Sequence, residues 1–418
     1  METLIIETPN STAVKRIHLV SLFVICFLST AFGGVISTLM SVYLPVVVKD
    51  LQVTTNTAKL DTISGYINSL FIFGWTAGGF LWGLISDKTG RKTAFLLALG
   101  SYGLATIATG LMSNWEGVMV CRFLSGVGVG GVLAVSVVLL SEIWPEKTRA
   151  IFIGIISVAF PIGIFSAGLI NFFVSSWRQG FFVGLVPIAI AIIGIWTLKE
   201  SDLWLLHRSG RTNKVKKSDA LFSISNRKAL ITGSVIFGTM LIGMWALFSW
   251  MPTWIQSLFT VDAPKERGLS MMFLGMGGLT GGFSSGWVAN TIGLRRSLIS
   301  SFAVCAIMAF ILFKTNDHFS TIIYIEIAVL ALFFGVSQGV LSVYIPMLFP
   351  TSVRASATGF CFNIGRLFTG AAVLFIGVLV NVMGGYANSL FIFSWVFVVG
   401  LLVVIFIRDI QPVNQVEK

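Results

Sequence analysis

The residues best suited to do chemistry in this sequence are ionisable side chains that interrupt long apolar stretches. Arg122 and Arg366 each lie within such a stretch, and Glu326 is the one acid that lies well inside one. Arginine stays charged, and its planar fork matches the oxygens of a carboxylate, phosphate or sulfonate. The two arginines therefore predict a site for an organic anion. A carboxyl group in an apolar setting is suited to proton transfer, so Glu326 is a candidate proton carrier.

Each of these residues also has a purely structural interpretation. Arg122 opens the segment Arg-Phe-Leu-Ser-Gly-Val-Gly and could brace neighbouring helices, and Glu326 could lie at the level of lipid headgroups. Arg366 lies about twelve residues into its stretch, which is about 18 Å at a helical rise of 1.5 Å per residue and therefore near the middle of a membrane. Further side chains that could line a cavity beside the arginines are Asn68, Trp245, Gln338 and Asn363.

The elements that must position these residues are long apolar segments. Hydrophobic residues make up 56% of the 418 residues and charged residues 11%. Segments of this length cross about 30 Å of hydrocarbon as helices, because the bilayer offers no partners for backbone polar groups. The expected fold class is therefore an all-α membrane protein with twelve transmembrane helices, near residues 18–45, 61–86, 92–112, 115–141, 149–174, 178–198, 229–256, 268–290, 296–314, 320–346, 354–380 and 386–408.

The distribution of basic residues predicts the topology. The net charge is +11, and most of the 28 Lys and Arg fall in alternate connections between apolar segments. By the positive-inside rule these connections, and both termini, are cytoplasmic. The pattern predicts a multi-pass protein of a bacterial-type inner membrane and argues against nucleic acid as the partner of the positive charge. The first apolar segment is too long for a signal peptide and is interpreted as a retained helix.

One polar segment divides the chain. Residues 199–228 are rich in Lys and Arg and predict a cytoplasmic linker loop between an N-terminal half, 1–198, and a C-terminal half, 229–418. The four cysteines lie in apolar segments without paired or metal-type spacing, and the three histidines form no metal set. Since a nucleotide-binding loop is also missing, we expect no cofactor, no metal and no enzymatic activity.

A degenerate repeat relates the two halves. Gly83–Lys92 reads Gly-Leu-Ile-Ser-Asp-Lys-Thr-Gly-Arg-Lys, and Gly286–Arg295, 203 residues later, reads Gly-Trp-Val-Ala-Asn-Thr-Ile-Gly-Leu-Arg. Duplicated helix bundles are the usual architecture of secondary transporters. Asp87 lies among basic residues at a helix end, where a carboxylate can bind a guanidinium or a helix N-terminus. Asp87 is therefore a candidate lock that holds one arrangement of the halves.

These residues resemble the signature loop of the major facilitator superfamily (MFS), between its second and third helices, and the resemblance extends over essentially the whole chain. The matching residues are Gly83, Asp87, Gly90, Arg91 and Lys92. The second copy departs from the pattern, because Asn290 replaces the acid and Leu294 the first basic residue. The resemblance implies two six-helix halves around a central cavity that opens alternately to either side.

Further motifs narrow the resemblance. Glu142–Arg149 resembles the Glu-x6-Arg motif of sugar and metabolite porters, and Ser249–Thr253 the Trp-x-Pro-Thr segment of metabolite:proton symporters. Arg354–Gly359 followed by Asn363–Arg366 is similar to a segment of aromatic-acid:proton symporters and related proteins. In contrast to those symporters, the first apolar segment contains no acidic residue.

The expected function is proton-coupled uptake of a small organic anion by a monomeric secondary transporter in the lipid bilayer. The open alternatives are a sugar or polyol carrier, a drug or metabolite efflux transporter, and a non-transporting membrane receptor. The predicted substrate contacts are Arg366, Arg122, Asn363, Gln338, Asn68 and Trp245, and the predicted proton-coupling residue is Glu326. The predicted gating residues are Gly83, Asp87, Gly90, Arg91, Glu142 and Arg149.

Overall fold

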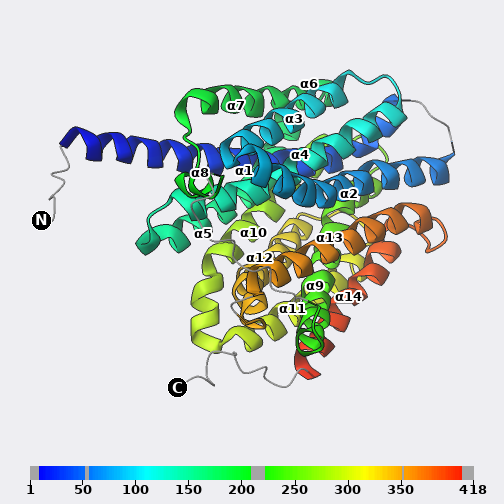
Figure 1. The fold of residues 1–418 in the computed structure, drawn as a ribbon. Helices are drawn as coiled ribbons and strands as arrows, with labels where there is room; N and C mark the ends of the chain where they lie inside the picture. Colours follow the sequence, from blue (N-terminus) through cyan, green and yellow to red (C-terminus); the bar gives the residue numbers. More distant parts are fainter. Residues whose placement is uncertain (1–8, 52–55, 209–221, 351–352, 407–418) are drawn as a thin grey trace, which may run out of the picture.

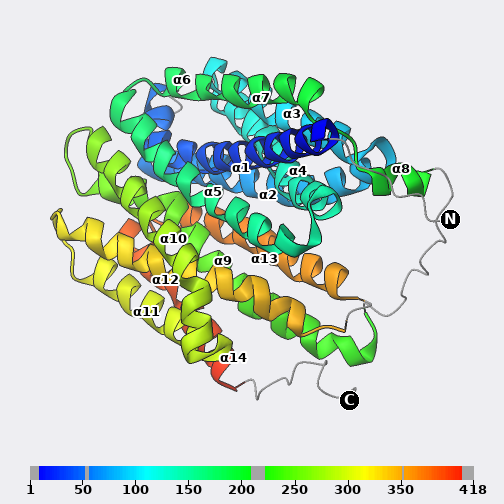
Figure 2. The ribbon, with the colours of Figure 1, turned by 90° about the vertical axis from the view of Figure 1, so that its left-hand side faces the viewer.

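The chain folds into two bundles of long helices that lie against each other (Figures 1 and 2). The structure is a computed structural model that describes residues 9–51, 56–208, 222–350 and 353–406, and the regular elements in these ranges are helices. Their bounds are α1 Pro9–Asp50, α2 Thr57–Thr89, α3 Arg91–Leu111, α4 Trp115–Ile143, α5 Glu146–Phe173, α6 Trp177–Gly180, η1 Phe181–Gly184, α7 Leu185–Thr197, α8 Asp202–Arg208, α9 Ile224–Ser257, α10 Pro264–Ile292, α11 Leu294–Lys314, α12 Ile322–Met347, α13 Arg354–Leu379 and α14 Tyr386–Phe406.

The twelve predicted spans are confirmed. Within the described ranges, 11 helical segments are long and apolar enough to cross a membrane, and α6, η1 and α7 together form one of them. The twelfth predicted span is α10, which is 29 residues long and begins with the charged residues Lys265, Glu266 and Arg267. These charges and its many glycines lower its hydropathy, but it packs between α5 and α12 like its neighbours.

The duplication seen in the sequence is reproduced in the backbone. Helix α2 ends at Thr89 and α3 begins at Arg91, and 203 residues later α10 ends at Ile292 and α11 begins at Leu294. The residues between them, Gly90 and Gly293, have φ values of 109° and 87° and nearly equal ψ values of 154° and 153°. A positive φ is strained for residues with a Cβ, so both turns require glycine.

The packing inside each half repeats as well. A Cβ on Gly74 or Gly78 of α2 would lie 2.1 or 2.0 Å from a carbonyl oxygen of α4. Their equivalents Gly277 and Gly281 would meet carbonyl oxygens of α12 at the same two distances. Small residues four apart allow helix backbones to approach closely within membranes, and here they join α2 to α4 and α10 to α12.

The two halves meet through α2 against α13 and α5 against α10 (Figure 2). We name the two ends of the molecule by α2: the Asp61 face lies at its beginning and the Asp87 face at its end. Near the Asp61 face the backbones touch, because a Cβ on Gly65 would lie 3.1 Å from Leu374 O and one on Gly168 2.4 Å from Gly268 O.

The same helix pairs are apart towards the Asp87 face. A Cβ on Gly79 would still meet the Asn363 side chain at 3.3 Å, whereas one on Gly83, a turn further on, would meet no described residue within 4 Å. The same holds for glycines on the partner helices towards this face: Gly154, Gly282, Gly286 and Gly359. In this conformation the halves are therefore closed at the Asp61 face and separate towards the Asp87 face.

The segment between the halves differs from the predicted linker. Its first ten residues are docked on the N-terminal half: Ser201 and Trp204 are buried, and residues 202–208 form α8. Its last residues belong to α9, which begins at Ile224. Residues 209–221 and both predicted cytoplasmic termini, 1–8 and 407–418, lie outside the described residues.

Candidate functional site

Three aromatic rings meet between the two halves. Trp75 of α2 stacks on Phe160 of α5, with ring centroids 5.6 Å apart, and meets Trp245 of α9 edge to face at 5.3 Å. Phe160 and Trp245 are 6.2 Å apart, so each ring contacts the other two. These separations are typical of favourable aromatic pairs. We call Trp75, Phe160 and Trp245 the aromatic cluster; it contains the predicted residue Trp245 and two residues that the sequence did not single out.

Arg366 joins this cluster from α13. Its guanidinium carbon lies 5.2 Å from the centre of the Trp75 ring, a cation–π distance. Its Nη1 donates to Asn363 Oδ1 at 3.2 Å, and Asn363 Nδ2 donates to Gly359 O. Among the ion pairs of the described residues none involves Arg366. The predicted pair Arg366 and Asn363 thus presents a cation without a carboxylate partner beside a flat aromatic ring.

Arg122 lies deeper and is bound to the backbone. It is 1% exposed, its Nη1 donates to Ile36 O at 2.8 Å and its Nη2 to Ser37 O at 3.5 Å, and it stacks over Phe71 at 4.1 Å. These contacts tie α4 to α1 and α2. They favour the bracing interpretation of Arg122 over direct contact with substrate in this conformation.

The remaining predicted cavity residues, Asn68 and Gln338, differ in whether their side chains are already hydrogen-bonded. Asn68 is buried, and its Nδ2 donates to Ser249 O at 3.2 Å, which makes it a hydrogen bond between α2 and α9. Gln338 on α12 has a buried Nε2 without a hydrogen-bond partner among the described residues. Asn68 is therefore used in holding the halves together, and Gln338 is a donor that this conformation leaves unsatisfied.

Glu326 lies near the beginning of α12 and forms a hydrogen bond with the loop that joins α11 to α12. Its Oε2 accepts from Asn316 Nδ2 at 2.8 Å, and Asn316 follows the end of α11. No described contact joins Glu326 to Arg366 or to the aromatic cluster. The contact favours the headgroup-level alternative, and the proton-carrying role stays a prediction.

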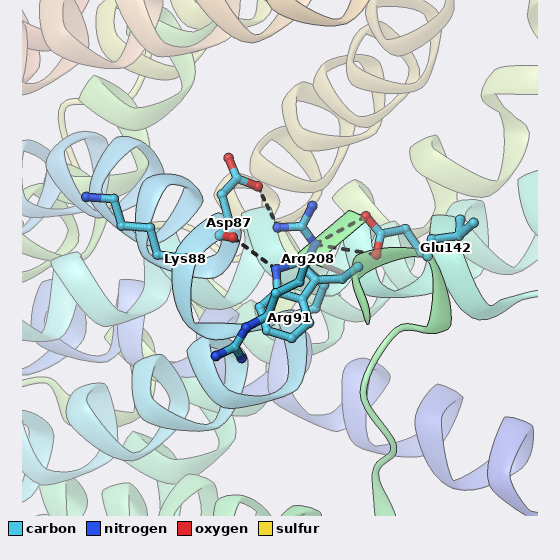
Figure 3. A pocket seen from close by; sticks show the side chains of 7 residues that line it. Asp87, Lys88, Arg91, Glu142 and Arg208 are labelled. Carbon is cyan, nitrogen blue, oxygen red and sulfur yellow. Dashed lines mark hydrogen bonds and ion pairs between the residues drawn. The ribbon is translucent and has the colours of Figure 1, made fainter. Parts of the chain in front are cut away.

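The α2–α3 turn forms a charged cluster at the Asp87 face, beside a cavity of about 400 Å³ (Figure 3). Arg91 Nη1 binds Asp87 Oδ1 at 2.5 Å, and Arg91 Nε binds Glu142 Oε1 of α4 at 3.2 Å. The predicted gating residues Asp87, Arg91 and Glu142 are therefore together. Arg149 is not among them, because its Nε donates to Trp144 O.

A carboxylate that the prediction did not include completes this cluster. Glu200, just after α7, accepts from the backbone N–H groups of Arg91 at 2.7 Å and Lys92 at 3.0 Å, and so caps the beginning of α3. Trp204 Nε1 donates to Asp87 O at 2.9 Å. A Cβ on Gly90 would lie 2.3 Å from Glu200 Oε2, a second reason why this position is glycine. These groups belong to the N-terminal half and to residues 199–208, so within the described residues the Asp87 cluster does not bridge the halves in this conformation.

Other residues of this structure carry weaker sequence signals. Asp61 stands at the edge of its apolar segment and nevertheless contacts the C-terminal half through Asn381 and Tyr386. Arg267 directly precedes the segment predicted at 268–290 and nevertheless is 1% exposed and pairs with Asp262 at 2.5 Å. Trp75 follows one of the glycines that pack α2 on α4, a position that the glycine repeat could have marked as internal.

Comparison with known proteins identifies the class of this fold and site. The sequence matches the family model described as Major Facilitator Superfamily over residues 22–372. It is 26% identical over 381 residues to the niacin transporter NiaP of Acinetobacter baylyi, which covers 83% of this chain and 85% of that protein. It is 24% identical over 401 residues to the cis,cis-muconate transport protein of the same organism, covering 93% and 94%.

A solved structure shows the same architecture. The inward open conformation of the xylose transporter XylE from E. coli superposes with a TM-score of 0.78 at 15% identity, covering 94% of this chain and 96% of that one. The family match and the relatives show a multi-pass membrane transporter rather than an enzyme, and they confirm the resemblance drawn from the sequence motifs. The chain belongs to the major facilitator superfamily.

Proposed function

We propose that this transporter carries a small, flat organic anion through a site between its halves, and that Arg366 binds the anionic group. The observation that carries the proposal is the Arg366 guanidinium over the Trp75 ring, without an acidic partner among the described residues. A charge in the apolar middle of a membrane is expensive, and a carboxylate substrate would satisfy it through two parallel hydrogen bonds.

The aromatic cluster supports a flat substrate. Trp75, Phe160 and Trp245 come from both halves, so a planar molecule that stacked against them would contact both halves at once. Two relatives are described as transporters of niacin and of cis,cis-muconate, and both compounds are conjugated carboxylates. A sugar or polyol is the weaker candidate because Asn68, a polar group suited to hydroxyls, is already bonded to Ser249 O.

We further propose that the Asp87 face is cytoplasmic and that uptake is driven by protons. The orientation is supported by the basic residues around the α2–α3 turn, since positive charge favours the cytoplasmic side. The cation and the rings lie on the helices that meet across the two halves. Alternate closure at the Asp61 and Asp87 faces would therefore expose one site to each side in turn.

Transport by the purified protein in liposomes tests these proposals. We expect labelled nicotinate, benzoate or cis,cis-muconate to accumulate when the outside is made acidic, and the accumulation to collapse with a protonophore. Xylose is the neutral comparison, and liposomes without protein are the control for leak. Accumulation of xylose but of no anion would refute the anion site and favour the sugar alternative. Transport of an anion without dependence on the proton gradient would refute proton coupling alone.

A further inference from the structure

A second acidic residue of α2 bridges the two halves at the face opposite to Asp87. Asp61, in the second turn of α2, accepts a hydrogen bond from Asn381 Nδ2 at 3.1 Å through Oδ2. Through Oδ1 it accepts from the hydroxyl of Tyr386, the first residue of α14. Asp61 belongs to the N-terminal half and both donors to the C-terminal half. We call Asp61, Asn381 and Tyr386 the clasp.

The clasp lies beside a close backbone contact between the halves. A Cβ on Gly377 of α13 would lie 2.6 Å from the backbone oxygen of Asp61 and 2.8 Å from Gly65 Cα. The Tyr386 ring lies 5.7 Å from Trp250, whose Nε1 donates to Val373 O in the next turn of α13. Tyr386 is therefore held by packed helices while this face is closed, and Asn381 lies in the turn that joins α13 to α14.

The chemistry of the clasp favours closure. A half-buried carboxylate has two neutral donors, and hydrogen bonds to an ionised acceptor are about twice as strong as neutral ones. No cation pairs with Asp61 among the described ion pairs, so water or these donors must satisfy it. Opening the Asp61 face would pull the carboxylate away from both donors.

We propose that the clasp is the gate of the Asp61 face: it holds that face closed in this conformation and breaks when the site opens there. This inference rests on the proposed alternation between the two faces. It assigns to Asp61 the role that Asp87 does not fulfil here, because the Asp87 contacts remain within one half and α8. Helix α2 thus contributes an acidic residue to each face, Asp61 to one and Asp87 to the other.

The test is the separation of the halves at the Asp61 face, measured by electron spin resonance between two labels. Glu116→Cys in the N-terminal half and Asp317→Cys in the C-terminal half place labels at exposed positions of that face, and the native cysteines are buried. Asp61→Asn should shift the distances to longer values and raise the ratio of open to closed protein about tenfold or more, the equivalent of one lost charge-assisted bond. Asn keeps the size of the side chain but offers one acceptor where two are needed.

Two further variants make the result specific. Tyr386→Phe removes one hydroxyl and should open the face in the same direction, and the double variant should open it no further than Asp61→Asn alone. Asp50→Asn is the matched control: Asp50 accepts from Trp177 Nε1 and pairs with Arg178 at the same face, but entirely within the N-terminal half. It should leave the distances unchanged.

The outcomes separate this inference from the proposed function. Unchanged distances in both Asp61→Asn and Tyr386→Phe would overturn the gate, as would an equal opening in Asp50→Asn. The measurement requires no substrate. A gate that opens in the Asp61→Asn protein while no anion is transported would therefore uphold the clasp and reject the proposed substrate.

Discussion

Removing the guanidinium of Arg366 should weaken substrate binding and leave the folded protein intact. In Arg366→Ala the Trp75 ring stays supported by Phe160 and Trp245, and Asn363 keeps its bond to Gly359 O. The loss is therefore confined to the contact with the anion. A hydrogen bond to a charged group contributes about 1.5–3 kcal/mol, and 1.4 kcal/mol is tenfold in affinity. We expect the dissociation constant to rise about ten- to a hundredfold.

Arg366→Ala should weaken substrate binding but should not destabilise the fold of the substrate-free protein. An arginine in the middle of a membrane helix is disfavoured by about 2.5–3.5 kcal/mol, and among the described residues Arg366 contacts Asn363 and the Trp75 ring. Without substrate, Arg366→Ala should thus unfold at the same temperature as the wild type or higher. Arg366→Lys should recover only part of the affinity, because lysine keeps the charge and loses the planar fork.

Equilibrium binding of labelled nicotinate or benzoate to detergent-purified protein measures the change, with thermal unfolding in parallel. Arg296→Ala is the matched control, because Arg296 is an exposed arginine at the beginning of α11. Near-native affinity in Arg366→Ala would refute the anion site, and a large fall in the unfolding temperature would show that the arginine is structural.

Three further predictions concern the turns and Glu326. Asp87→Asn should abolish most transport, because Asp87 is the predicted lock between the two arrangements of the halves. Substrate affinity should stay within a few-fold, because the Asp87 side chain is largely exposed and its pairing contributes at most about 1 kcal/mol; lost binding in folded protein would contradict this. Gly90→Ala should lower the unfolding temperature, since φ is 109° and the new Cβ would meet Glu200, whereas Gly83→Ala should not; equal temperatures for the two variants would refute the argument. Glu326→Gln should retain proton-driven uptake if the carboxylate only bonds Asn316, because glutamine can still accept from it; loss of that uptake alone would support the predicted proton-carrying role of Glu326.

The helices were predictable because their signal is local. The segment predicted at 61–86 is α2, Thr57–Thr89, and that predicted at 296–314 is α11, Leu294–Lys314. Continuous hydropathy marks each span without reference to the rest of the chain. The turn glycines were predictable for the same reason, since the repeat at Gly83 and Gly286 fixes their place between two spans.

The site was predicted less completely because it depends on contacts between distant parts of the chain. Arg366 was identifiable by the cost of its charge, but Trp75 and Phe160 are apolar residues in apolar segments and differ from their neighbours only by position. Arg122 carries the same charge as Arg366, yet the oxygens that accept its hydrogen bonds belong to the α1 backbone, 85 and 86 residues away. The partners of Asp61 lie 320 and 325 residues away, and a single sequence contains no signal that joins such residues.

The two halves share their contacts but differ in chemistry. Across the 203-residue repeat Gly65 corresponds to Gly268, and each meets a glycine of the other half, Gly377 or Gly168. This pair of contacts is what a duplicated bundle requires to close at one face. The chemistry has not been kept in both copies: Asp61, Trp75 and Asp87 of α2 correspond to Pro264, Gly278 and Asn290 of α10. If symmetry alone controlled closure, equivalent substitutions in α2 and α10 would have equal effects. The structure instead predicts that Asp87→Asn disables the carrier, whereas Asn290→Ala at the equivalent turn leaves both transport and binding near the wild-type level. Equal loss of transport in the two variants would show that the repeated backbone, and not the side chains of α2, controls the alternation.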